Sequence, residues 1–173
     1  PAGAIAAVLS YAWAREQDKR ALAREALDRY RELNLIYDLS EQIGENLACE
    51  MFYGRTPAQL LDDAGALGPN LTSIHATHLA DSDIALLGGT GTGACFCPTT
   101  ERDLGDGIGP SRALDAAGSP LTLGSDSHAV IDLFEEARAV ELNTRLRDER
   151  RGHFSAADLL AAATVAGHRA LGW

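Results

Sequence analysis

Three short segments carry carboxylate and imidazole side chains at spacings suited to metal binding or proton transfer. They are Ser40-Glu41-Gln42, His75-Ala76-Thr77-His78 and Ser125-Asp126-Ser127-His128. Carboxylates and imidazoles are the side chains that bind zinc and exchange protons near neutral pH. Each segment follows a short apolar run, so the elements that build the core are also expected to position this chemistry.

The apolar runs are typical of buried strands, and amphipathic stretches separate them. Strands are expected near residues 35–39, 71–75, 93–97 and 121–125, and helices near 42–53, 57–64, 81–88, 110–117, 132–148 and 155–170. This alternation indicates βαβ units and a parallel sheet. The three polar segments then stand at the carboxyl ends of strands, where a (β/α) barrel keeps its reactive groups.

Short local patterns mark where elements begin and end. Thr56-Pro57 and Ser155-Ala156-Ala157-Asp158 have the form of a cap followed by a helix. Glycines at Gly88-Gly89, Gly105-Asp106-Gly107 and Gly118 are expected to separate the elements. A phosphate-binding loop at residues 88–93 is rejected, because it lacks the Gly-Lys-Ser/Thr ending and precedes a strand.

The first part of the chain has a different pattern. Residues 2–33 are alanine-rich, and their apolar positions recur every three or four residues, which predicts one long helix. We therefore divide the chain into a helical segment, 1–34, and a strand-and-helix part, 35–173. At 173 residues the chain is shorter than the roughly 250 of a full barrel. The expected fold is α/β, half of a (β/α)8 TIM-like barrel with its last four strands.

Charge and composition exclude several classes of partner. The net charge is −10, and the 15 basic residues are scattered or paired with acids, which disfavours nucleic acid and anionic membranes. No apolar run approaches the roughly 18 residues of a membrane span, and the start does not resemble a signal peptide. Cys49, Cys95 and Cys97 are an odd count and are expected to be reduced thiols, as in a cytoplasmic protein. Alternation along a strand points Cys95 and Cys97 to the same side, as small core residues.

Four blocks carry a resemblance to a known family. They are Leu39-Ser40-Glu41-Gln42, His75-Ala76-Thr77-His78-Leu79, residues 97–108 and Gly124-Ser125-Asp126-Ser127-His128. Together they resemble the formimidoylglutamate deiminases of the amidohydrolase superfamily, over residues 35–173. The resemblance implies a zinc enzyme in a distorted barrel. Its small-molecule substrate would be N-formimino-L-glutamate, hydrolysed to N-formyl-L-glutamate and ammonia in histidine degradation.

The resemblance also implies residue roles. Asp126 would be a metal ligand that accepts a proton from the hydrolytic water, and Glu41 would be the proton shuttle. His75 would polarise the attacking water, and His128 is a candidate substrate-binding group. Asp38 stands where the family places a metal-binding histidine, and a carboxylate can also bind zinc.

Several of these residues also have a plainer interpretation. Glu41 could be an acid in the first turn of a helix, which the helix dipole favours. Asp126 could cap the following turn, and His128 could be an ordinary surface histidine. His78 is expected to be structural.

The sequence departs from the family in one motif. The family carries His-x-His on its first strand, and none of the five histidines of this chain forms that pattern. We therefore expect the isolated chain to be inactive, and whether it binds any metal stays open. The alternative is a non-catalytic half-barrel fragment or engineered scaffold. A half barrel also leaves sheet edges and an apolar inner face uncovered, which predicts self-association or a dimer that completes the sheet.

Overall fold

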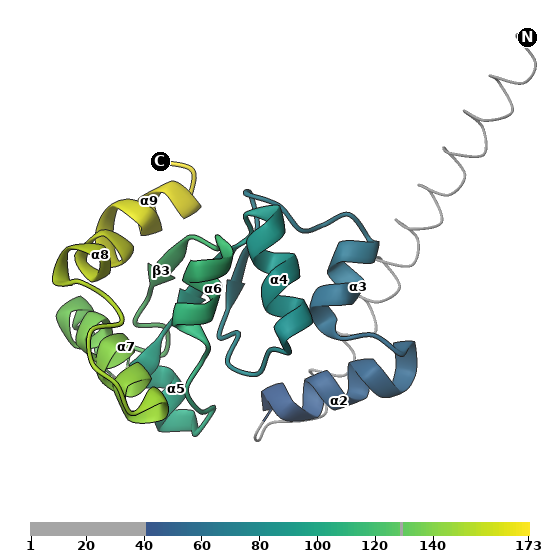
Figure 1. The fold of residues 1–173 in the computed structure, drawn as a ribbon, viewed down its shortest axis with the longest axis horizontal. Coiled ribbons are helices and arrows are strands. Elements are labelled where there is room, and N and C mark those ends of the chain that lie inside the picture. Colours follow the sequence, from purple (N-terminus) through teal and green to yellow (C-terminus); the bar gives the residue numbers. More distant parts are fainter. Residues whose placement is uncertain (1–40, 129) are drawn as a thin grey trace, which may run out of the picture.

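The computed structural model describes residues 41–128 and 130–173, and its centre is a small parallel sheet (Figure 1). The strands are β1 (Thr72–Ile74), β2 (Gly93–Phe96) and β3 (Leu121–Leu123), in the order β1-β2-β3. The register pairs Ile74 with Cys95 and Cys95 with Thr122. Three of the predicted strands are thereby confirmed.

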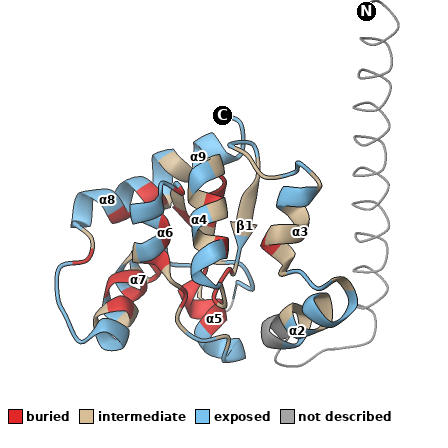
Figure 2. Cartoon of the chain, turned by 45° about the vertical axis from the view of Figure 1, so that its right-hand side comes forward, coloured by how far each residue is buried: buried red, intermediate tan, exposed pale blue. Residues whose placement is uncertain are grey.

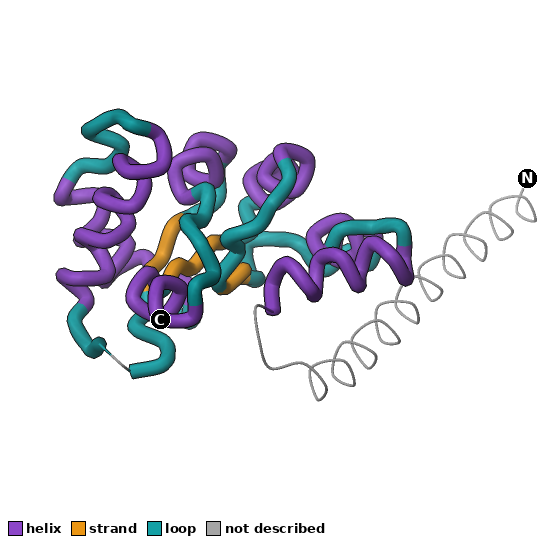
Figure 3. The backbone as a smooth tube through the Cα atoms, turned by 90° about the horizontal axis from the view of Figure 1, so that it is seen from below, coloured by secondary structure: helices purple, strands orange, loops and turns teal. Residues whose placement is uncertain are grey.

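Helices alternate with the strands and flank them on several sides (Figure 3). They are α2 (Glu41–Tyr53), α3 (Pro57–Asp63), α4 (Asp81–Thr90), α5 (Pro98–Leu104), α6 (Ser111–Ala117), α7 (Leu133–Asp148), α8 (Ala156–Ala161), the π-helix η1 (Ala162–Ala166) and α9 (Gly167–Ala170). The α4 helix joins β1 to β2, whereas α5 and α6 join β2 to β3. The chain is therefore an α/β protein, as the alternating pattern predicts.

The core lies between the sheet and the helices, where the buried residues gather (Figure 2). Ala94 and Phe96 of β2 are 0% and 2% exposed and pack with Leu87 of α4 and Leu114 of α6. Burying a side chain the size of leucine or phenylalanine stabilises a fold by about 1.5–3 kcal/mol. Because side chains alternate along a strand, Cys95 lies on the opposite face of the sheet.

Glycine has a packing role in α4 that the sequence does not reveal. A Cβ atom on Gly88 would lie 2.3 Å from the carbonyl oxygen of Ala117, so α4 and α6 touch backbone to backbone at this point. The expected break at Gly88-Gly89 is therefore wrong, since the helix runs on to Thr90. It ends at Gly91, which has a left-handed φ of 69°.

Both predicted helix caps are present. Thr56 and Gln59 form a capping box at the start of α3, and Ser155 and Asp158 form another at α8. The single helix expected near 155–170 is instead three consecutive pieces, with a π-helical turn in the middle. The apolar spacing of that segment fits both kinds of turn, so the sequence does not distinguish them.

The short helix α5 is absent from the sequence-based expectations. Pro98 occupies its first turn, where a missing N–H costs nothing. The Glu101 side chain accepts a hydrogen bond of 2.8 Å from the Cys97 backbone N–H. Gly105 ends the helix with a φ of 78°. These are ordinary start and stop signals, and they lie inside the block that carries the family resemblance.

Some expectations fall outside the described part of the chain. The helix at 2–33, the strand near 35–39 and Asp38 all lie there. The fourth strand, the half barrel and the division at residue 34/35 therefore stay predictions. Within 41–128 and 130–173, no helix has the length and apolar character needed to cross a membrane.

Candidate active site

The His75 side chain lies between two carboxylates at the carboxyl ends of the strands. Its Nδ1 is 3.3 Å from Oε1 of Glu101, and its Nε2 is 3.3 Å from Oδ2 of Asp126. The three residues follow β1, β2 and β3 respectively. The fold therefore brings together His75 and Asp126, two residues singled out in the sequence, and adds a third.

The backbone is unusual at the same place. His75, Asp126 and His128 have φ angles of 55°, 44° and 60°, in the left-handed region that non-glycine residues seldom adopt. In the described chain only Glu149 shares this feature. Such conformations cost free energy and cluster at functional sites, where the surrounding structure enforces them.

Glu101 holds the imidazole ring at its Nδ1 side. The Glu101 side chain is 5% exposed, and the same Oε1 that faces His75 accepts the Cys97 N–H. The hydrogen bond to Glu101 raises the pKa of His75 against the opposing effect of burial. The negative charges of Glu101, Asp126 and Asp106 raise this pKa further. The site therefore favours a protonated imidazole that donates to carboxylates on both sides.

The loop that carries Asp126 is fastened to α5. Thr100 is 1% exposed, and its hydroxyl donates to the Ser125 carbonyl at 3.2 Å. The same oxygen accepts the Ser127 N–H at 3.2 Å. Both neighbours of Asp126 are thus bound to the residue that precedes Glu101.

A buried glutamate fastens α5 in turn to α7. Glu136 is fully buried and accepts the Thr99 N–H at 3.0 Å, and the Thr99 hydroxyl also donates to it. Thr99, Thr100 and Glu101 are consecutive, and all three are at most 4% exposed. One turn of α5 therefore fixes the position of Glu101, which contacts His75, and of the loop that carries Asp126.

Two thiols lie beside this group. Cys95, Cys97 and Cys49 are all free thiols, as expected. Cys97 is buried and Cys95 half-buried, and the Cys97 thiol forms a hydrogen bond that lowers the pKa of Cys95 to about 7. The pKa of Cys97 is raised by the same bond. Cys97 is therefore a buried core residue, as predicted, whereas Cys95 is partly exposed.

The other predicted site residues are His128, Glu41 and Asp38, and of these only the side chain of His128 is described. His128 is exposed, and no described hydrogen bond or ion pair connects it to His75, Glu101 or Asp126. Glu41 begins α2, although its side chain, like the whole of Asp38, is outside the described part of the structure. Their roles stay predictions.

Glu101 and Thr100 are site residues that the sequence does not single out. Pro98 at a strand end, followed three residues later by an acid, is a helix-start signal that points to Glu101. The contacts with His75 and Ser127 are tertiary, and no local pattern predicts them.

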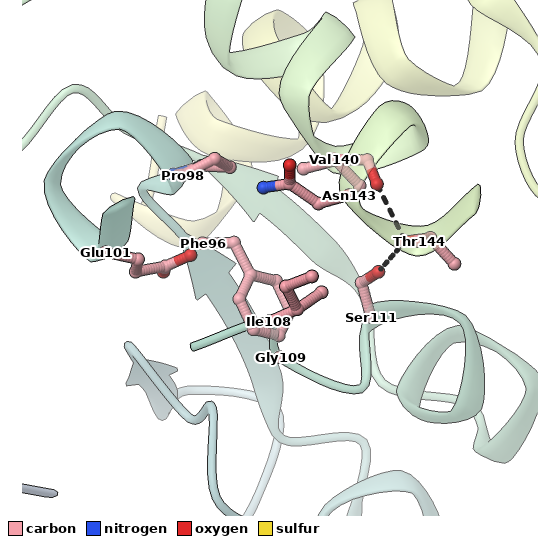
Figure 4. Close-up of a pocket in the computed structure, with 9 residues that line it drawn as sticks. All are labelled: Phe96, Pro98, Glu101, Ile108, Gly109, Ser111, Val140, Asn143 and Thr144. Carbon is pink, nitrogen blue, oxygen red and sulfur yellow. Dashed lines mark hydrogen bonds between the residues drawn. The ribbon is translucent and has the colours of Figure 1, made fainter. Parts of the chain in front are cut away.

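A small cavity lies beneath α5, on the core side (Figure 4). Its volume is about 10 Å³, the space of roughly one water molecule. Phe96, Glu101 and Ile108 line it, and a 3.2 Å hydrogen bond between Ser111 and Thr144 borders it. It is far too small for a substrate, so we assign it to packing.

The described side chains do not by themselves form a zinc site. A catalytic zinc ion takes three protein ligands and keeps a further position open. Within 41–128 and 130–173, no three His, Cys, Asp or Glu side chains converge in that way. Asp126, whose side chain is 45% exposed, is the predicted ligand that remains available in this part of the chain.

Proteins of similar sequence include several deaminases. Formimidoylglutamate deiminase of Pseudomonas aeruginosa is 36% identical over 141 residues, which is 78% of this chain and 31% of that protein. The 8-oxoguanine deaminase of the same organism is 38% identical over 112 residues, 63% of this chain and 25% of the relative. A 5'-deoxyadenosine deaminase of Methanosarcina barkeri is 33% identical over 137 residues, 78% and 32% respectively. The chain thus spans about a third of the length of these relatives, or less.

Solved structures of similar fold also include an amidohydrolase and a deaminase. An amidohydrolase from Brucella melitensis matches with a TM-score of 0.72 and 31% identity, over 78% of this chain and 31% of that one. An adenosine deaminase from Xanthomonas campestris with bound zinc matches with a TM-score of 0.71 and 30% identity, over the same shares. A model of the amidohydrolase family matches residues 9–173. The chain therefore belongs to the amidohydrolase family.

Proposed function

We propose that this chain supplies His75 and Asp126 to an amidohydrolase that deiminates N-formimino-L-glutamate. Water attacks the formimino carbon, the C–N bond to the terminal nitrogen breaks, and the products are N-formyl-L-glutamate and ammonia. The observation that carries the proposal is the pairing of His75 with Asp126, 3.3 Å apart at the ends of two strands. The similarity to a formimidoylglutamate deiminase supports the substrate.

The geometry of His75 and Asp126 suits the first proton transfer of such a reaction, from the attacking water. Asp126 is partly exposed and can accept a proton from the attacking water. His75 is held by Glu101 with its Nε2 toward Asp126, where it can polarise the water and stabilise negative charge as it develops. The departing nitrogen must also be protonated, and Glu41 remains the candidate for that step.

Zinc is part of the proposal, because zinc is bound in a structure of a related deaminase. When bound, zinc acts as a Lewis acid that makes water more acidic. Asp126 and Asp38 are the ligand candidates in this chain. The remaining ligands would have to come from a second polypeptide that carries the His-x-His motif, because this sequence lacks that motif.

A purine is the second candidate substrate, since an 8-oxoguanine deaminase is 38% identical over 112 residues. Both reactions replace a carbon–nitrogen bond by a carbonyl and release ammonia. The formimidoylglutamate deiminase aligns over 141 residues, and for this reason we place its substrate first. The similarity to active deaminases does not favour the alternative of a non-catalytic module.

The test is ammonia release from N-formimino-L-glutamate in the presence of zinc. The chain is assayed alone and after mixing with the amino-terminal portion of the P. aeruginosa formimidoylglutamate deiminase, which supplies the missing His-x-His strand. We expect release only from the mixture. Asp126→Ala, His75→Asn and Glu41→Ala should abolish it, whereas Asp103→Asn, on the exposed side of α5, should not.

Sedimentation first establishes that the two parts associate. A stable complex that releases ammonia from 8-oxoguanine alone would move the proposal to the second substrate. A stable complex that hydrolyses neither compound, or one in which Asp126→Ala stays active, would overturn the roles proposed for Asp126 and His75.

A further inference from the structure

Two thiols lie together on the sheet face that is turned away from the helix core. Ala94 and Phe96 are buried against the helices, so Cys95 between them points to the other face. Cys97 follows one residue after Phe96, at the start of α5. The core packing of Phe96, 2% exposed, therefore fixes the backbone from which both thiols project.

The two sulfur atoms converge on a space beside Gly124. A Cβ atom placed on this glycine would lie 3.2 Å from Sγ of Cys97 and 3.8 Å from Sγ of Cys95. Glycine leaves this space free, and both sulfurs border it. The two thiols also influence each other's ionisation, since the interaction with Cys97 lowers the pKa of Cys95.

We propose that Cys95 and Cys97 form a dithiol site for a thiophilic element, with trivalent arsenic as the ligand that fits best. Thiolates select soft metals and metalloids. Zinc would need four ligands and finds no third among the described side chains. Trivalent arsenic with one organic substituent needs only two sulfur atoms to complete its three bonds. This proposal does not depend on the proposed function.

The binding reaction balances without any oxidant or reductant. With phenylarsine oxide, two As–S bonds form and the As–O bond breaks. The two thiol protons leave with the oxygen as one water molecule, and arsenic remains trivalent. The lowered pKa of Cys95 assists the first attack, because the thiolate is the nucleophile.

The site adjoins His75. The backbone N–H of His75 donates to the Cys95 carbonyl at 3.1 Å, and the charges of the His75 and Cys95 side chains influence each other. Arsenic bound to both sulfurs would replace the thiolate charge by a neutral group. We therefore expect binding to block both thiols.

The experiment uses phenylarsine oxide and intact-protein mass spectrometry of the 173-residue chain. We expect one phenylarsenic adduct per chain. Ethanedithiol should remove it, whereas an equivalent amount of a monothiol should not, because a chelate is displaced by another chelate. Cys49→Ser, which removes the thiol on α2, should leave the adduct intact, and Cys95→Ser and Cys97→Ser should each abolish it.

A labelling experiment on the unaltered chain covers the case in which a variant fails to fold. Iodoacetamide should modify Cys95 in the untreated chain and spare it after phenylarsine oxide, whereas Cys49 should be modified in both cases. Cys97 is 3% exposed, so its protection alone does not distinguish the two states. Any of three results would overturn the proposal. Iodoacetamide could label Cys95 after phenylarsine oxide, the adduct could persist in a folded Cys95→Ser or Cys97→Ser variant, or a monothiol could remove it.

Discussion

At the scale of single residues, the position of His75 between Glu101 and Asp126 governs its protonation. Each ring nitrogen faces a carboxylate oxygen at 3.3 Å. A histidine in this setting stays protonated at higher pH than a free one, since both neighbours stabilise the imidazolium. The protonation of His75 therefore depends in part on Glu101, which has no proposed role in the chemistry itself.

Replacing Glu101 by glutamine should lower the pKa of His75, because the hydrogen bond to Glu101 is the main cause of its raised value. The pKa is measured by NMR titration of the imidazole. Asp103→Asn is the matched control: it removes a charge from the exposed side of the same helix and should have little effect. An equal shift in both variants would show that general charge, and not the contact, sets the pKa.

The same contact has a pH-dependent effect on stability. Because folding raises the pKa of His75, its stabilising contribution is complete below the unfolded value of about 6.5 and is lost as pH rises through the folded value. We expect His75→Asn to flatten the pH dependence of the unfolding free energy over that window. Urea unfolding at several pH values measures this, and an unchanged slope would contradict it.

The sequence identifies His75 and Asp126 because each follows an apolar strand, and strand ends meet at one edge of a parallel sheet. It does not identify Glu101, although its helix-start pattern is visible. The role of Glu101 arises from contacts between distant elements, which local propensity does not predict.

At the scale of elements, two neighbouring glycines of α4 provide a matched pair of substitutions. Gly88→Ala should destabilise the fold by about 1–3 kcal/mol, because its Cβ would lie 2.3 Å from the Ala117 carbonyl oxygen. Gly89→Ala meets no atom within 4 Å and should stabilise the helix by about 0.5–1 kcal/mol. Thermal and urea unfolding of both variants checks the prediction, and equal effects of the two would refute the close packing of α4 on α6.

Adjacent glutamates on α7 provide a second pair. Glu136 is fully buried and accepts two hydrogen bonds from Thr99, so Glu136→Gln should cost about 1–3 kcal/mol. Glu135 makes longer ion pairs at the surface, 3.6 Å to Arg102 and 3.9 Å to Arg138, and Glu135→Gln should cost under about 1 kcal/mol. Unfolding in urea distinguishes the two, and a smaller loss for Glu136→Gln would contradict the anchoring role.

The sequence predicts the three described strands and most of the described helices, because apolar periodicity and caps such as Ser155 with Asp158 are local. Two features escape it for physical reasons. The close approach at Gly88 overrides the usual helix-breaking tendency of glycine. The π-helical turn at residues 162–166 has apolar spacing that an α-helix would share.

At the scale of the whole molecule, the sheet face away from the core carries an exposed apolar side chain in the described part of the chain. Ile74, in register with Cys95, is 59% exposed. An exposed apolar side chain on a sheet face, beside a strand edge, favours association. The predicted self-association therefore has a specific candidate surface.

Ile74→Lys should weaken self-association of the chain, measured by sedimentation over a range of concentrations. Leu146, 75% exposed on α7, provides the control substitution Leu146→Lys, which should not weaken self-association. Both variants make the net charge of −10 less negative, so reduced repulsion alone would strengthen association. If the chain stays monomeric at every concentration, or if the two variants associate equally, Ile74 does not lie in a self-association surface.

The three consecutive buried residues of α5 have a consequence for motion. Thr99 holds α7, Thr100 holds the loop around Asp126, and Glu101 holds His75. A segment fastened in this way opens as a unit, so its amide hydrogens exchange with solvent through one shared event. We expect the amides of Cys97, Thr99 and Ser127 to show a common free energy of opening in hydrogen–deuterium exchange. Widely different values would mean that the Asp126 loop opens on its own, and that this carboxylate moves independently of the histidine that it faces.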